Sequence, residues 1–262
     1  SMAMGNAIKW LKLRVGHVPP HLPESTAKEM LTTQIETFIE ERITLADKAI
    51  ISYAESRIAP SDVILVYASS FVVETILLHA HEQGVPFRVV VADAGPKFEG
   101  RDMLARLLQA GLHCTYANLH ALSYVMPEVN KVLLGASSML LNGTLVARAG
   151  TALVAMLAHE RAVPVLVCCE TYKFTERVLL DSICYNELGD PDDLVPTDPA
   201  GSKLADWRDM PRLKLLNLLY DVTPMKYITM VVTEAGVVPP TSVPVIIRED
   251  AARMQLQAQE AV

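Results

Sequence analysis

The part of the chain whose residue types best suit anion binding is residues 135–151, which read G-A-S-S-M-L-L-N-G-T-L-V-A-R-A-G-T. The pair Asn142-Gly143 favours positive φ and a tight turn. We predict that this turn leads from a strand into a helix, whose first backbone N–H groups have no partner within the helix. Asn142, Gly143 and Thr144 are therefore our candidate anion pocket, with an ordinary strand-to-helix turn as the alternative.

Other patterns that mark catalysis or metal binding are weak in this chain. The turn after the first predicted strand, residues 68–72, contains no glycine, so the dinucleotide fingerprint is missing there. There is no P-loop and no nucleophile elbow. His79 and His81 are two residues apart and do not share a helix face. We expect no catalytic residue of these kinds, no metal and no cofactor.

The elements that position these residues follow from hydrophobic periodicity. Residues 30–56 repeat apolar side chains at helical spacing, and apolar runs alternate with helical stretches after Pro60. The predicted strands are residues 63–68, 87–93, 113–117, 131–136 and 163–169, and the predicted helices between them are 72–83, 101–110 and 145–161. This alternation predicts a Rossmann-like α/β fold, a parallel sheet with helices on both faces.

The remainder of the chain completes the predicted division into domains. Residues 187–206 are polar and predict a loop. Residues 215–222 predict a strand, residues 228–233 a strand or a short helix, and residues 243–247 an extended run. We predict a helical N-terminal segment at 5–58, a Rossmann-like domain at 59–249 and a polar tail at 250–262.

The composition limits the class of partner. The chain has 262 residues, 51% of them hydrophobic, and a formal net charge of −7. Direct binding to nucleic acid normally needs a basic surface, so it is not expected. No segment reaches the ~20 apolar residues of a membrane-spanning helix, and we expect no membrane association. Four cysteines without C-x-x-C spacing predict buried free thiols and a cytoplasmic protein, with Cys168 and Cys169 on opposite faces of a strand.

Residues 135–151 resemble the signature G-A-D-x-x-x-x-N-G-D-x-x-x-K-x-G-T. This signature belongs to a family that unites sugar-phosphate isomerases with the alpha, beta and delta regulatory subunits of initiation factor 2B. The resemblance covers residues 5–249 and includes Tyr220-Asp221-Val222-Thr223-Pro224, which is similar to a D-x-T-P motif. Residues 5–11, 168–174 and 186–194 are most similar to the delta-type branch of the family.

Departures from the signature bear on function. The isomerases use a cysteine after the first strand and the aspartate of G-A-D as an acid/base pair, and the resemblance places Ala68 and Ser137 at these positions. Alanine cannot exchange a proton, and serine without a neighbouring base titrates far above working pH. The resemblance therefore implies a regulatory, non-catalytic subunit of the exchange factor for initiation factor 2. A sugar-phosphate sensor and a residual isomerase remain the alternatives.

The resemblance also implies partners. We expect pairing with the beta subunit, further contacts within factor 2B, and self-pairing of the isolated chain. Leu216, Leu218 and Tyr220 are the candidate interface, with an ordinary core strand as the alternative. Glu41 and Leu45 lie one helical turn apart and are candidates for contact with the alpha subunit of initiation factor 2, with a solvated helix face or a core position as the alternatives. The helical segment is expected to be a truncated part of a larger helical domain.

Overall fold

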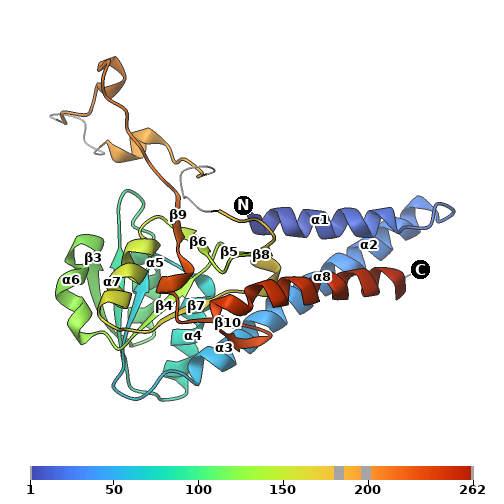
Figure 1. Cartoon of the computed structure of the whole chain (residues 1–262), viewed down its shortest axis with the longest axis horizontal. Coiled ribbons are helices and arrows are strands. Elements are labelled where there is room, and N and C mark those ends of the chain that lie inside the picture. The colour runs from blue at the N-terminus through green and yellow to red at the C-terminus, as the bar shows by residue number, and fades with distance from the viewer. Residues whose placement is uncertain (1, 180–185, 196–201, 261–262) are drawn as a thin grey trace.

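The computed structural model describes residues 2–179, 186–195 and 202–260, which contain a seven-stranded sheet (Figure 1). The strand order is β11-β10-β7-β4-β1-β2-β3, and every neighbouring pair is parallel except β10 with β11. The strands are β1 (Val63–Tyr67), β2 (Arg88–Asp93), β3 (His113–Asn118), β4 (Lys131–Gly135), β7 (Val165–Cys168), β10 (Met230–Thr233) and β11 (Gly236–Val238). The five strands predicted before residue 170 are confirmed, and of the two alternatives for residues 228–233 the structure has the strand, β10.

Both faces of the sheet are covered at its inner strands β1, β2, β4 and β7, which explains why these strands are largely apolar, whereas the edge strand β3 is partly exposed. Along β1, Val63, Leu65 and Tyr67 face one core and Ile64 and Val66 face the other. Helices α3 (Leu45–Glu55), α4 (Phe71–Glu82) and α5 (Gly100–Gln109) cover the second core, and α6 (Leu122–Val125) and α7 (Thr151–Glu160) cover the first. The predicted Rossmann-like α/β fold is confirmed.

The buried cysteines follow the same alternation. Cys168 belongs to the core under α3 and α4, whereas Cys169 belongs to the core under α7. The prediction that they point to opposite faces is confirmed. Cys184 lies outside the described residues.

Helices precede the first strand and project from one side of the sheet (Figure 1). They are α1 (Met2–Gly16), α2 (Glu24–Ile39), the π-helical turn η1 (Glu40–Thr44) and α3. Helix α2 begins directly after Pro23, ahead of the apolar repeat that starts at residue 30. A proline there fits a helix start, because its fixed φ and missing N–H cost nothing ahead of the first turn.

A second sheet, of order β8-β5-β6-β9, corrects the prediction of one helix over residues 145–161. Its strands are β5 (Ser138–Leu140), β6 (Leu145–Arg148), β8 (Phe174–Thr175) and β9 (Tyr220–Thr223). Residues 145–148 are strand β6 because they pair with β5 and with β9, and α7 starts only at Thr151.

The C-terminal run that we expected to be extended is also helical. Val243 begins α8 (Val243–Glu260), which projects beside α1 and α2 (Figure 1). Val243 and Ile247, four residues apart, both pack into the core under α7, and this spacing suits a helix. The helix extends through residues 250–260, so most of the predicted polar tail has regular structure.

Candidate functional site

The described parts of residues 186–219 form an arm that rises from the body at the start of β9 (Figure 1). Two of its runs lie antiparallel, because Gly189 N–H donates to Asn217 O at 2.8 Å and Leu219 N–H donates to Glu187 O at 3.1 Å. Asn217 is buried and its amide donates to Asp190 O at 2.8 Å. The strand prediction for residues 215–222 is therefore confirmed only for β9 and for the bridge between Leu188 and Leu218.

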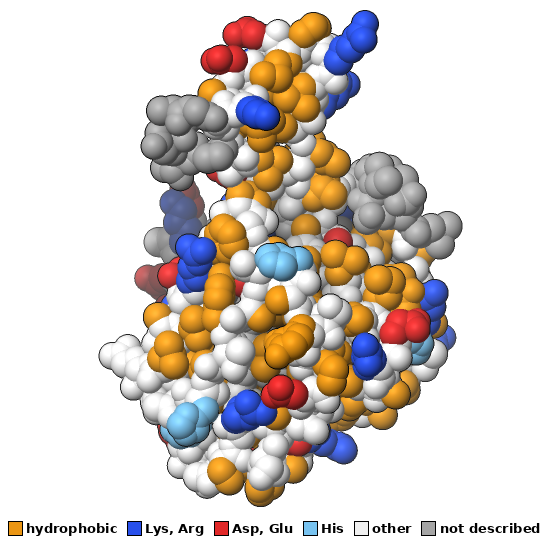
Figure 2. Space-filling view, turned by 90° about the vertical axis from the view of Figure 1, so that its left-hand side faces the viewer, with side chains coloured by type: hydrophobic (Ala, Val, Ile, Leu, Met, Phe, Trp, Pro, Cys, Tyr) orange, Lys and Arg blue, Asp and Glu red, His pale blue; other side chains and the backbone are white. Residues whose placement is uncertain are grey.

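Side chains at residues 216–218 of the arm point alternately outward and inward, and the leucines are the ones that face solvent. Leu216 is 66% exposed and Leu218 is 38% exposed, on either side of the buried Asn217. Leu188, opposite Leu218, is also exposed, and Figure 2 shows hydrophobic side chains gathered along this projecting part. Tyr220 differs, because it is half-buried and its ring lies against Arg148. Leu188, Leu216 and Leu218 thus form an apolar surface, which we call the leucine face.

The predicted anion pocket has a different structure from the one expected. Asn142 and Gly143 lie in the hairpin loop between β5 and β6, where Gly143 has φ 73° and donates its N–H to Leu140 O at 2.8 Å. Thr144 N–H points to Asn142 Oδ1 within the same loop, at 3.4 Å. The tight turn is confirmed, but it leads into a strand, so the expectation of a helix N-terminus at these residues is wrong.

The true helix N-terminus downstream is already occupied. Asp221 Oδ2 on β9 accepts the N–H groups of Gly150 at 2.7 Å and of Ala152 at 2.9 Å, at the start of α7. Burial raises the pKa of Asp221 to about 6, although the two backbone hydrogen bonds favour the carboxylate. An internal carboxylate therefore takes the place that an anionic ligand would need. The D-x-T-P-like motif that contains Asp221 can be recognised in the sequence. That Asp221 accepts hydrogen bonds from the start of α7 cannot be recognised there.

The topological switch point of the large sheet lies between β1 and β4, where such folds bind ligands. A cleft of about 260 Å³ beside it is lined by Ala68, Lys97 and residues 216–219 of the arm. Arg148 in this cleft donates to Glu99 at 2.6 and 2.7 Å, and its guanidinium lies 5.2 Å from the centre of the Tyr220 ring. Arg148 is thus neutralised by the chain's own Glu99, whereas Lys97 is a further cation in the lining of the cleft.

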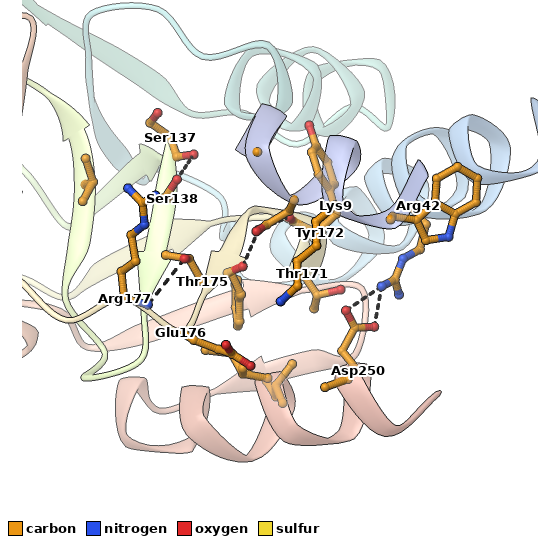
Figure 3. Close-up of a pocket in the computed structure, with 18 of the residues that line it drawn as sticks. Lys9, Arg42, Ser137, Ser138, Thr171, Tyr172, Thr175, Glu176, Arg177 and Asp250 are labelled. Atoms are coloured by element: carbon orange, nitrogen blue, oxygen red, sulfur yellow. Dashed lines mark hydrogen bonds and ion pairs between the residues drawn. The ribbon is translucent and has the colours of Figure 1, made fainter. Parts of the chain in front are cut away.

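Ser137 lies in a second, larger cavity of about 1000 Å³ between α1, α8 and the small sheet (Figure 3). Trp10 and Phe38 form one wall, with ring centres 4.5 Å apart, and the ion pair of Arg42 with Asp250 lies at one side (Figure 3). Its polar lining includes Ser137, Ser138, Thr175 and Arg177. No sequence pattern predicted this cavity, because its walls come from segments far apart in the chain.

The two positions that match the isomerase pair therefore line different hollows. Ala68 faces the cleft and Ser137 faces the larger cavity. Within the described residues, no histidine or carboxylate hydrogen-bonds to the Ser137 hydroxyl, and no cluster of His, Cys, Asp or Glu is arranged to hold a metal ion. In the same described part of the chain, no helix has the length and apolar content needed to cross a membrane.

Glu41 and Leu45 lie on the outer surface of the helical segment. Glu41 is exposed in η1, and Leu45, at the start of α3, is 48% exposed. The wide turn arises where Leu45 N–H donates to Glu40 O, five residues back, and such turns are frequent at functional sites. The neighbouring Ala46 and Ile50 are buried, so α3 is fixed on its inner side while Leu45 faces solvent.

The fold defines a doubly wound α/β protein in which Arg148 of the switch-point cleft is paired with Glu99 and the start of α7 is bound by Asp221. The Initiation factor 2 subunit family matches residues 1–240, and the chain belongs to this family. This confirms the resemblance seen in the sequence.

Three relatives show how far the similarity reaches. The chain is 49% identical to translation initiation factor eIF2B subunit delta of Dictyostelium discoideum over 253 residues, which are 95% of this chain and 40% of that protein. It is 31% identical to ribose 1,5-bisphosphate isomerase of Thermococcus kodakarensis over 225 residues, 85% of this chain and 68% of the isomerase. A crystal structure of the tetrameric eIF2B-beta2-delta2 complex from C. thermophilum superimposes with a TM-score of 0.76 at 38% identity, covering 89% of this chain and 70% of that one. The chain spans less than half of the curated delta subunit.

Proposed function

We propose that this chain is a regulatory, non-catalytic subunit of the guanine-nucleotide exchange factor for translation initiation factor 2. In this role it helps to sense phosphorylation of the alpha subunit of factor 2, in the cytoplasm. The observation that carries the proposal is the combination of high identity to a delta subunit with Ala68 and Ser137 at the isomerase positions. A scaffold that keeps the fold but lacks both proton-transfer groups suits recognition better than catalysis.

The leucine face supports a partner role. Leucines 188, 216 and 218 remain exposed although the arm that carries them is held by its own hydrogen bonds. Exposed apolar surface of this kind commonly marks a protein interface. We propose that the beta subunit covers it, as the name of the beta2-delta2 complex suggests for a relative, and that other factor 2B subunits bind elsewhere.

Glu41 and Leu45 are the proposed contact with the alpha subunit of factor 2. Their side chains are exposed and lie on a helical segment whose inner side is fixed against the sheet. A carboxylate next to an exposed leucine offers a polar guide beside an apolar anchor, an arrangement found in many interfaces.

The test of the proposal is co-purification of the chain with the beta subunit, followed by mass determination of the product. A stable one-to-one assembly, or a multiple of it, is expected. Absence of association at micromolar concentrations, with both proteins folded, would contradict the subunit role.

The larger cavity favours one second candidate function. Its polar side, with Ser137, Thr175 and Arg177, could hold a small phosphorylated sugar without turning it over. Titration calorimetry with ribose 1,5-bisphosphate separates the possibilities. Binding with turnover would support a residual isomerase, binding alone would support a sensor, and neither would leave the subunit role as the only candidate.

A further inference from the structure

The backbone of the arm is paired along one edge only. Two hydrogen bonds between residues 187–189 and 217–219 flank the bridge of Leu188 with Leu218, one on each side. In antiparallel pairing, two residues flanked in this way do not bond to each other, and their N–H and C=O groups point away from the opposite run. Leu218 therefore directs its backbone polar groups to the outer edge of the arm. Leu216, two residues earlier, does the same because these directions alternate along a strand.

This outer edge is open. Within the described residues, neither the N–H nor the C=O of Leu216 or Leu218 takes part in a hydrogen bond. The side chains of the same two residues are exposed and share one face of the arm. The edge thus offers two donors and two acceptors at the spacing of alternate residues, which is the arrangement that a further strand needs.

The sequence of the arm does not protect this edge. Proteins commonly protect an exposed strand edge with charged residues, prolines or bulges. Residues 215–219 read Leu-Leu-Asn-Leu-Leu and contain neither a charge nor a proline, and the residue before them is the exposed Lys214. An unprotected apolar edge on an arm that projects from the body (Figure 1) is typical of a surface that a partner covers.

The arm is also fixed in place without a partner. At its base, the amide group of Asn186 donates to Tyr220 O at 2.5 Å and its oxygen accepts the Tyr220 N–H at 3.3 Å. Further out, the buried Asn217 amide donates to Asp190 O at 2.8 Å. An edge that is already ordered loses little conformational freedom when a strand binds to it, and this favours association.

We propose that the beta subunit adds an extended segment to the outer edge of residues 216–218, so that backbone hydrogen bonds as well as leucine contacts join the two proteins. This inference rests on the pairing with the beta subunit proposed above. The added segment is apolar at alternate positions, because Leu216 and Leu218 present their side chains on one face. A carboxylate at one end of the segment complements Lys214.

A comparison of Leu216→Pro with Leu216→Ala tests the proposal, by sedimentation velocity with purified beta subunit. Both variants lose most of the leucine contact, but only proline lacks the backbone N–H. Because this N–H points away from residues 187–189, proline should leave the internal bonds of the arm intact. The dissociation constant of Leu216→Pro should be roughly five- to tenfold higher than that of Leu216→Ala, as expected for the loss of about one hydrogen bond.

Hydrogen exchange of the native complex, resolved by residue, is an independent measurement that decides if Leu216→Pro does not fold. The N–H groups of Leu216 and Leu218 should exchange about tenfold more slowly in the complex than in the isolated chain. Asn217 should change less, because its backbone faces residues 187–189. Contact through side chains alone would slow all three amides alike.

The outcomes separate this inference from the subunit role. If the native chain binds the beta subunit but the two folded variants bind equally, or if the three amides slow alike, strand addition is overturned and the pairing stands. If the native chain does not bind, both fail. Alternate slowing in the isolated chain at rising concentration, without beta subunit, would assign the edge to a second copy and overturn the choice of partner.

Discussion

Removing the leucine face should weaken pairing with the beta subunit without unfolding the chain. The perturbation is the double variant Leu216→Ala, Leu218→Ala. Both side chains are already largely in water in the isolated chain, so its thermal midpoint should change little.

The size of the effect follows from the exposed area. Burying a whole leucine side chain contributes about 1.5–3 kcal/mol, so burying the exposed two thirds of Leu216 and two fifths of Leu218 contributes about 1.5–3 kcal/mol together. Alanine retains a small part of this contact. The dissociation constant for the beta subunit should therefore rise roughly 10- to 100-fold.

Sedimentation velocity with purified beta subunit over a concentration series measures this change. Leu153→Ala is the control, because Leu153 is a similarly exposed leucine but lies on α7, away from the arm. The control should bind like the native chain. If the double variant binds as tightly as the native chain while its fold is intact, the leucine face is not the interface and the reasoning is refuted.

Three further predictions concern sensing, chemistry and pH. Glu41→Lys should leave the thermal midpoint unchanged, since Glu41 is exposed, but should weaken binding to phosphorylated alpha subunit of factor 2; equal affinities for native and variant, by biolayer interferometry, would contradict this. Ala68→Cys with Ser137→Asp should give no turnover of ribose 1,5-bisphosphate in a product assay, because the two positions line separate hollows; measurable turnover would show that they meet. Asp221 has a pKa raised from 3.8 to about 6, so its protonation should stabilise the fold by up to about 3 kcal/mol as the pH falls from 7 to 4. In urea unfolding Asp221→Asn should lose that part of the slope, and an unchanged slope would argue against a buried charge.

Part of the fold could be predicted because local patterns and burial agreed. Four of the five early strands were predictable because they are apolar on both faces. The fifth, β3, is partly exposed and was predictable because it follows the helical stretch at 101–110. The departures at Ala68 and Ser137 were visible in the sequence, since the absence of a proton-transfer group needs no structure to be recognised.

The errors have a common cause in short apolar runs. Residues 145–148 fit both a strand and a helix, because four residues are too few to separate the two periods. Their pairing with β9, more than seventy residues away, makes them a strand. Val243 to Ile247 fitted a strand equally well, and packing into the core under α7 made them a helix.

The candidate site depended still more on tertiary structure. Asp221 occupies the start of α7, and Glu99 neutralises Arg148, although 71 and 49 residues separate the partners. The sequence by itself determined the class of fold, the family resemblance and the loss of the isomerase pair, because these depend on residue type and on neighbours within one element. Only the tertiary structure decided that the start of α7 is occupied by Asp221 and that Leu216 and Leu218 face water, because both depend on groups that folding brings together from distant segments.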